Sequence, residues 1–396
     1  MRIGVVVFDE HARTAFGDER LANPGQVWAS VAGGSPFQVE NMSSDLNNDV
    51  IWWTNLLYDD NRGGRLSRSG GFRHEAWLRC GFTSLMSELG LDLNGSNGPR
   101  TARVMATLGD RVVQLATKRF GISELHAYRF NEDVANSITD ARCRIPEQYW
   151  QVVDPIAEHG YVSTTCHSGM RENMSTITIT RNRVRHARQV LATKLPDDEG
   201  WRLHEGSISE HNLEEMDTPF LVRCTVNGMD PIVEDILPIR SESNGIREWL
   251  TDVEWKKMRE YANIKIGAVL FGDSSSVCLN NAIPEDDLAE LSFSQGLLAE
   301  QVWTGVASRK RRNTGRWGFS AAAAWLRSAD KMAMFEHVRY LHEQGVKVSH
   351  YGFGNMIVRY AQGELEHVIG TVIEAGLLPP LSKVQALRNG SIREGN

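Results

Sequence analysis

Residues 158–168 read EHGYVSTTCHS, and this stretch decides how the middle of the chain is interpreted. Val162 is followed by Ser163, Thr164 and Thr165, directly after a glycine and a tyrosine. β-Branched and aromatic residues fit the pleated surface of a sheet, so we expect a strand over residues 160–165. The hydroxyl side chains are typical of an ordinary strand face, and they also suit a site that needs small hydroxyls at a strand edge.

Strand-forming segments recur along the chain, and helical spacing returns in its C-terminal part. Residues 3–8 (IGVVVF) form a continuous apolar run that predicts a strand buried on both faces. Residues 319–333 place apolar side chains at helical spacing, residues 346–360 predict a β-hairpin, and a last helix ends at Gly376. The other candidate strands are residues 124–130, 175–180, 219–226 and 264–271.

This order predicts an α+β fold with a strand-rich middle section, built as a mixed or split sheet, between helical N- and C-terminal regions. We expect an N-terminal α/β region (1–121), a strand-rich region that holds the site (122–275), and a C-terminal helix, hairpin, helix region (276–396). The last region resembles half of a ferredoxin-like or polymerase-palm unit. Its turn, YGFGN, carries no carboxylate, so we expect packing or assembly there rather than catalysis by a metal.

Composition excludes several classes of protein. The chain has 396 residues, of which 41% are hydrophobic and 23% charged, as in a folded protein with a sizeable core. A net charge of -7 argues against phosphate binding over the whole surface, but leaves a local basic patch open. Five scattered cysteines without a CxxC pair favour a reducing compartment over a zinc finger or a disulfide framework. With no signal peptide or membrane span predicted, we expect a cytoplasmic protein, of a cell or of a host.

Three polar positions follow one another along the strand-rich section. Arg129 lies near the end of a candidate strand, Ser163 lies on another, and Glu215 and Asp217 lie just ahead of a third. This order resembles that of the arginine-type mono-ADP-ribosyltransferases, in which an arginine is followed by an aromatic-x-Ser-Thr-Ser/Thr strand and then by an acidic turn that leads into a strand. The resemblance covers roughly residues 122–226 and rests on short motifs.

The resemblance implies NAD as the cofactor and assigns roles within its pocket. Arg129 would bind the phosphate and ribose side of NAD, and Ser163 with Thr164 would shape the pocket. Asp217 would stabilise the oxocarbenium-like ribose, and Glu215 would accept a proton from the acceptor. The sequence departs from the family pattern in two ways: YRF replaces aromatic-Arg-Gly, and Glu-Met-Asp replaces Glu-x-Glu. The shorter Asp217 carboxylate would sit about one methylene short of the ribose hydroxyl.

The chemistry explains these residue types without the family name. Breaking the bond between nicotinamide and ribose develops positive charge on the sugar, so a fixed carboxylate lowers the barrier. The planar fork of an arginine suits a diphosphate better than the point charge of a lysine. A purely structural interpretation stays open, in which Arg129 is a surface ion-pair partner and residues 214–217 are a solvated helix end.

Two further sets of residues suggest other chemistries. Asp9 and Asp273 follow candidate strands, where carboxylates hold magnesium ions in many phosphoryl-transfer enzymes, although a Gly-Asp turn is also plain hairpin chemistry. Residues 308–317 form the one dense basic run, which suits phosphate binding with an aromatic ring for stacking, and equally suits a solvated loop. Its candidate residues are Arg309, Lys310, Arg311, Arg312, Arg316 and Trp317.

Three hypotheses follow. The first is an NAD-dependent mono-ADP-ribosyltransferase acting on a protein or nucleic-acid acceptor. The second is a structural or assembly protein without catalysis, such as a component of a virion or of another complex. The third is a metal-dependent nucleic-acid enzyme. The expected partners are a macromolecular acceptor or an assembly partner, nucleic acid through residues 308–317, and further copies of the chain in an oligomer, with no membrane.

Overall fold

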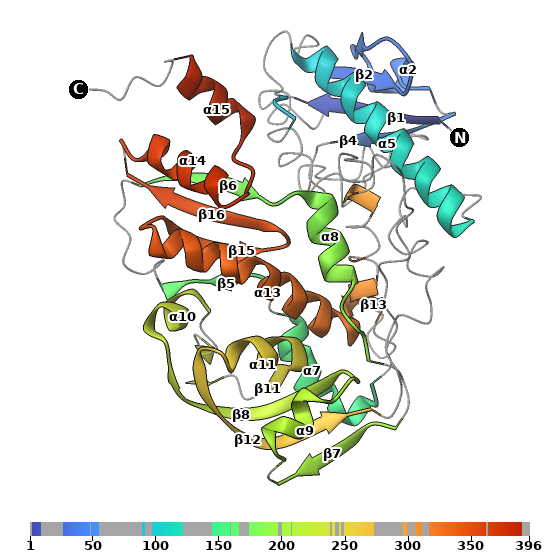
Figure 1. Cartoon of the computed structure of the whole chain (residues 1–396). Coiled ribbons are helices and arrows are strands. Elements are labelled where there is room, and N and C mark those ends of the chain that lie inside the picture. The colour runs from blue at the N-terminus through green and yellow to red at the C-terminus, as the bar shows by residue number, and fades with distance from the viewer. Residues whose placement is uncertain are drawn as a thin grey trace. The chain divides into compact units, whose positions relative to one another are not determined.

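The structure is a computed structural model, shown in Figure 1, and it divides the chain into two compact units. The N-terminal unit comprises residues 1–137, 291–301 and 380–389, and the central unit comprises residues 138–290, 302–379 and 390–396. The residues that the structure describes are 2–8, 27–47, 49–54, 89–91, 97–121, 145–158, 160–165, 174–196, 200–206, 208–237, 240–241, 245–246, 249–272, 296–298, 303, 306–310, 317–361 and 363–389.

A four-stranded sheet with the order β3-β2-β1-β4 forms the N-terminal unit. Its strands are β1 (Arg2–Phe8), β2 (Val27–Val31), β3 (Phe37–Gln38) and β4 (Val50–Thr54). β1 runs parallel to β4 and antiparallel to β2, and β3 is antiparallel to β2. Six of the seven residues of β1 are buried, which confirms the strand predicted to be buried on both faces.

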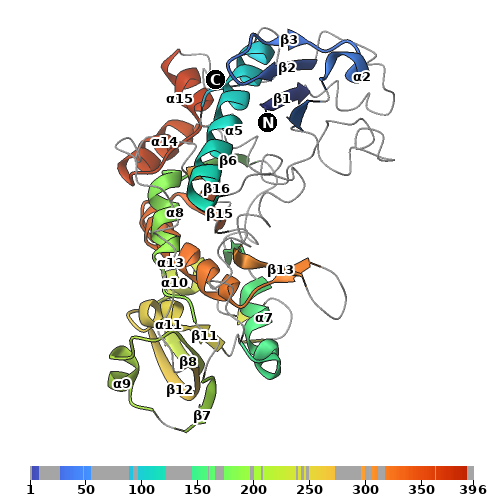
Figure 2. The same ribbon diagram turned by 90° about the vertical axis from the view of Figure 1, so that its right-hand side faces the viewer.

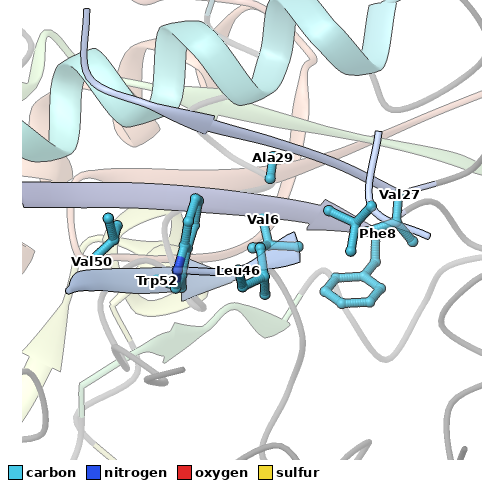
Figure 3. Packing of buried hydrophobic residues seen from close by; sticks show 8 residues of the cluster. Val6, Phe8, Val27, Ala29, Leu46, Val50 and Trp52 are labelled. Carbon is cyan, nitrogen blue, oxygen red and sulfur yellow. The ribbon is translucent and has the colours of Figure 1, made fainter. Parts of the chain in front are cut away.

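Apolar side chains fill both sides of this sheet. The 23-residue helix α5 (Gly98–Phe120) packs against β1 and β2. Figure 3 shows part of a cluster on neighbouring strands that includes Val6, Val50 and Trp52. Gly4 lets the indole approach, because a Cβ at this position would lie 2.4 Å from the Trp52 ring. The unit also contains the short helices α2 (Met42–Asp45) and α15 (Leu381–Arg388).

The central unit contains two four-stranded sheets, of which the first has the order β5-β15-β16-β6. These strands are β5 (Val162–Ser163), β6 (Ser175–Thr180), β15 (Lys347–Gly352) and β16 (Asn355–Tyr360), and all neighbours are antiparallel. Figure 2 shows the helices α8 (Arg183–Leu191) and α14 (Leu365–Glu374) on one side of these strands.

The second sheet has the order β11-β8-β12-β7. Its strands are β7 (Arg202–Glu205), β8 (Phe220–Met229), β11 (Trp249–Thr251) and β12 (Ala262–Phe271). Helix α11 (Asp252–Met258) begins directly after β11 with a capping box, in which Thr251 and Glu254 exchange side-chain and backbone hydrogen bonds.

Helix α13 (Ala322–Glu343) is the centre of this unit, because it packs against β15, α8 and α11, and also against α7 (Trp150–Glu158) and α10 (Pro231–Ile236). It buries charged side chains as well as apolar ones. Lys331 Nζ lies 2.8 Å from Glu254 Oε1, and both side chains are almost fully buried. Trp325 Nε1 donates to Asp252 Oδ1 at 2.7 Å, so two polar contacts join α13 to α11.

The remaining helices and paired strands of the central unit are short. They are η5 (Glu147–Tyr149), α7 (Trp150–Glu158), α9 (Glu210–Glu214), α10 (Pro231–Ile236), β9 (Arg240–Ser241), β10 (Gly245–Ile246), β13 (Ser308–Lys310) and β14 (Trp317–Phe319). The chain is thus a mixed α and β protein, as predicted. Among the helices that the structure describes, none has the length and apolar character needed to cross a bilayer.

Candidate functional site

Ser163 and Thr164, predicted to shape a cofactor pocket, lie at the edge of the first sheet of the central unit. β5 pairs with β15, and Ser163 is opposite His350. Thr164 is 3% exposed, and its hydroxyl donates to the carbonyl oxygen of Val348 at 2.7 Å. The Thr164 side chain therefore holds β5 onto β15, whereas Ser163 is half-buried and faces the other side.

Glu215 and Asp217, the predicted catalytic acids, lie between α9 and β8 of the second sheet. Both residues are exposed. Asp217 forms an ion pair with Lys194, whose hydrogen bond and charge hold the pKa of the Asp217 carboxyl below its usual value. Among the contacts of the described residues, none joins Ser163 to either acid, and the two acids precede a strand of a different sheet.

The other predicted site residues are described in part or not at all. Arg129, Asp9 and Asp273 lie outside the described residues, so their roles stay predictions. No group of three or more His, Cys, Asp or Glu side chains that could hold a metal ion occurs within the described ranges. Of the basic run, Arg311, Arg312 and Arg316 also lie outside them.

The ends of the basic run form a β-hairpin. Arg309 and Lys310 lie in β13 and Trp317 lies in β14, and these antiparallel strands are connected by residues 311–316. Its base is fixed to the unit, since Ser320 N donates to the carbonyl of Ala307 at 2.8 Å and the Ser320 hydroxyl to that of Val306 at 2.5 Å. The basic run is therefore attached to the folded unit at both ends.

Strand register divides the first sheet into a covered face and an open face. The covered face carries two rows across the strands, in which every side chain is at most 8% exposed. These rows are Val162, Tyr351, Met356 and Ile179, and Val348, Val358 and Ile177. The opposite side chains, which we call the open face, form one row of Ser163, His350, Ile357 and Thr178, and a second row of Lys347, Arg359 and Thr176.

The open face is polar, basic and accessible. Lys347, Thr176 and Thr178 are exposed, and Ser163, His350 and Arg359 are half-buried. Ile357, 37% exposed, is its one apolar side chain. None of the seven is acidic, so the face carries two fixed positive charges and four groups able to donate hydrogen bonds to an anion.

The turn between β15 and β16 is strained and strongly held. Gly352 pairs with Asn355, and the two residues between them, Phe353 and Gly354, have φ of 52° and 70°, as a type I′ turn requires. Phe353 is the only non-glycine residue with positive φ among those that the structure describes. A Cβ on Gly354 would lie 2.7 Å from the His186 ring. Strain of this kind persists only where surrounding contacts fix the backbone.

A buried carboxylate from α13 supplies those contacts. Asp330 is fully buried, and its oxygens accept from Phe353 N at 2.5 Å and from Gly354 N at 2.9 Å. Its Oδ1 also lies 2.6 Å from His186 Nε2. The guanidinium of Arg181, which can only donate, lies 3.3 Å from His186 Nδ1, so this nitrogen is the acceptor and Nε2 carries the proton.

Arg327 joins the basic hairpin to this turn. Its guanidinium lies 3.9 Å from the centre of the Phe319 ring in β14 and 5.7 Å from that of Phe353. It also donates to the carbonyl of Ala157. Burial lowers the pKa of Arg327 to about 10, and attraction to Asp330 opposes the shift. The base of the hairpin and the turn between β15 and β16 therefore contact the same buried cation.

The sequence did not indicate most of the open face. Ser163 was singled out, but His350, Ile357, Arg359 and Lys347 were not. Strict alternation would place Tyr351 on the same side as Lys347. The register shifts between Val348 and His350, where Ser349 is the extra residue, so the pattern inverts. The sequence alone does not show this bulge, and without it the side chains of the open face cannot be identified.

No protein-family model matches the chain, and no curated protein matches it. Solved structures of phi29 DNA polymerase are similar to it at low identity. The orthorhombic crystal form gives a TM-score of 0.46 at 9% identity, covering 90% of this chain and 80% of that chain. The post-translocation binary complex with primer-template DNA gives 0.43 at 8% identity, with the same coverage.

The prediction that the chain is an ADP-ribosyltransferase or another NAD-dependent glycosyltransferase is wrong. The contacts explain the error: the Thr164 hydroxyl is bound to β15, and the Asp217 carboxylate is paired with Lys194 ahead of another sheet. Short motifs matched the family in order, while the fold separates the groups that carry them. NAD binding itself stays a prediction.

Proposed function

We propose that the chain binds nucleic acid on the open face of the β5-β15-β16-β6 sheet. The observation that carries this proposal is the register of β15 and β16, which gives Lys347 and Arg359 adjacent places on a face without acidic side chains. A chain with a net charge of -7 binds a polyanion only where its positive charges are segregated. The open face is such a place.

The side chains of the face match the parts of a nucleic acid. Lys347 and Arg359 suit phosphate oxygens, and Arg359 can contact two oxygens at once. Ser163, Thr176 and Thr178 can donate hydrogen bonds to phosphate or sugar oxygens. Ile357 offers an apolar contact to a base or sugar. Because none of these contacts reads a base edge, the proposal is for binding without sequence preference.

The basic hairpin supports the same proposal. Residues 308–317 contain five basic residues and no acidic one, and β13 and β14 fix both ends of the run to the unit. The Arg327 side chain contacts both Phe319 at the base of this hairpin and Phe353 in the turn that connects β15 to β16. A nucleic acid on the open face and a second contact at the hairpin would therefore rest on one connected scaffold.

The test measures binding as a function of salt. Fluorescence anisotropy with a labelled oligonucleotide of about 20 nucleotides, single-stranded or duplex, gives the dissociation constant at several salt concentrations. Replacing Lys347 and Arg359 with Ala should weaken binding to single strands and reduce the slope of log K against log salt by about 1.4, since each lost phosphate contact contributes about 0.7. Lys265→Ala, an exposed lysine on β12 of the other sheet, is the matched control and should change neither quantity.

A second variant separates the hairpin from the sheet. Alanine at Arg309, Lys310, Arg311 and Arg312 should reduce the slope further when combined with the open-face variant. Equal slopes in the parent and in the Lys347 and Arg359 variant would contradict the proposal, as would a parent chain that binds no oligonucleotide at low salt.

A further inference from the structure

We infer that Ser163 and His350 form a nucleophile and general-base pair that accepts the acyl group of an activated carboxylic ester bearing an anionic group. The inference does not depend on nucleic-acid binding. It starts from the distance of 3.4 Å between Ser163 Oγ and His350 Nε2, which is at the long end of a hydrogen bond. Such pairs are often loose before a substrate binds.

Strand pairing brings the two side chains together. Thr164 N donates to the carbonyl of Ser349 at 3.0 Å, so these two residues occupy a hydrogen-bonded position of the antiparallel ladder. Ser163 and His350, the next pair along, therefore occupy a non-hydrogen-bonded position. In that position the side chains of opposite residues approach most closely. The serine and the imidazole are neighbours because of the backbone, not because of a chance rotamer.

Ser349 fixes which nitrogen of His350 carries the proton. The Ser349 hydroxyl is fully buried and donates to the carbonyl of Ile357 at 3.2 Å. His350 Nδ1 lies 3.1 Å from the same hydroxyl oxygen. A hydroxyl has one hydrogen, so Nδ1 must donate to it, and Nε2 is left as the acceptor that faces Ser163. Ser349 is thus a positioning residue, in the place that a carboxylate takes in many hydrolases.

The backbone of Ser163 supplies a donor for the oxyanion. β5 is an edge strand, and Thr164 N points toward β15. The N–H groups of a strand alternate in direction, so Ser163 N points away from β15. An N–H that points outward from the sheet edge, beside the attacking oxygen, is the kind of donor that stabilises a tetrahedral intermediate.

The neighbouring row defines the substrate class. Lys347 and Arg359 lie one row away from His350 and Ile357 on the open face. Their charges favour a substrate whose acyl part carries a carboxylate or phosphate. The described residues provide no metal cluster, and the step requires none.

The step balances without a further reactant. Ser163 Oγ forms a bond to the carbonyl carbon while its proton moves to His350 Nε2, and the bond between that carbon and the leaving oxygen then breaks. His350 returns the proton to the leaving oxygen. Water then attacks the acylated serine, with His350 again taking and returning the proton, so that the serine is regenerated and the acid is released.

The test uses the full chain and a fluorophosphonate probe, which reacts with activated serines and leaves a stable adduct that peptide mass spectrometry locates. The parent should carry the adduct on Ser163, Ser163→Ala should carry none at this peptide, and His350→Gln should label at least about 100-fold more slowly. Thr225→Ala, which removes an exposed hydroxyl opposite Lys265 in the other sheet of the unit, is the control and should label like the parent.

A second measurement tests the substrate class. The parent should cleave 4-nitrophenyl hemisuccinate faster than 4-nitrophenyl acetate, and Lys347→Ala should remove that preference. A parent chain without an adduct on Ser163 would overturn the inference, and so would a His350→Gln chain, folded by circular dichroism, that labels at the parent rate. Neither result bears on oligonucleotide binding, so the two proposals fail separately.

Discussion

Asp252, at the start of α11, has a carboxylate whose ionised form is disfavoured by burial. Burial raises its pKa from 3.8 to about 6, although the hydrogen bond from Trp325 and the charge of Lys256 both favour the ionised form. The difference between 3.8 and about 6 corresponds to about 3 kcal/mol between ionised and neutral forms. Because Asp252 is only partly buried, this value is an upper bound.

The sign of the pH dependence follows from the direction of the shift. Between about pH 4 and pH 6 the folded chain keeps the Asp252 proton that the unfolded chain has released, so stability falls as pH rises through this window. Asp252→Asn is neutral at every pH, and its side-chain oxygen can still accept from Trp325. We therefore expect the Asn variant to match the parent near pH 4 and to exceed its free energy of unfolding by about 1 to 3 kcal/mol at pH 7.

Urea denaturation followed by circular dichroism at pH 4.5, 5.5, 6.5 and 7.5 measures this difference, and contributions from all other titrating groups cancel between the two chains. Asp252→Ala is the matched control, because it removes both the charge and the acceptor for Trp325. It should show the same pH trend at a lower stability. A difference between Asn variant and parent that stays constant from pH 4.5 to 7.5 would refute the reasoning.

Two further predictions concern buried charges on α13. Lys331→Met should lower the free energy of unfolding by about 3 to 5 kcal/mol, because it removes the cation that is paired with the buried Glu254 carboxylate, and adding Glu254→Gln, which keeps the capping box, should recover most of the loss. Urea midpoints of the single and double variants check this, and an additive double variant would contradict it. Asp330→Asn should cost about 2 kcal/mol and speed amide hydrogen exchange at Phe353 and Gly354, because one of their acceptor oxygens becomes a donor. Unchanged exchange at both amides would show that other contacts hold the turn.

Local pattern was enough to predict the elements whose side chains alternate regularly. The strand predicted at residues 175–180 has the bounds of β6, and the one predicted at 264–271 lies within β12. The first alternates threonine with isoleucine, so burial and propensity agree. The strand expected over residues 160–165 is reduced to Val162–Ser163 in β5, because its pairing with β15 is short.

The candidate site depended on information that no single strand contains. His350 and Ser163 are 187 positions apart, and their contact needs both the pairing of β5 with β15 and the bulge at Ser349. The basic run was noticed from composition, but its attachment as a hairpin depends on Ser320 and on the ring contact of Phe319 with Arg327. Contacts over such separations are not encoded in spacing, so motif order alone could not show which of these side chains meet.

The buried charges of α13 specify geometry more than they add stability. Lys331 pairs with Glu254, Asp330 binds the turn at Phe353 and Gly354, and Arg327 binds the carbonyl of Ala157. Apolar side chains of similar size fill a core at least as favourably as a buried ion pair does, so stability alone does not account for these contacts. An apolar residue in place of Asp330 would leave two buried N–H groups without acceptors and the positive φ of Phe353 without restraint. That turn connects β15, which carries His350, to β16, which carries Arg359. The register of the open face therefore depends on the Asp330 carboxylate, although Asp330 is not part of that face.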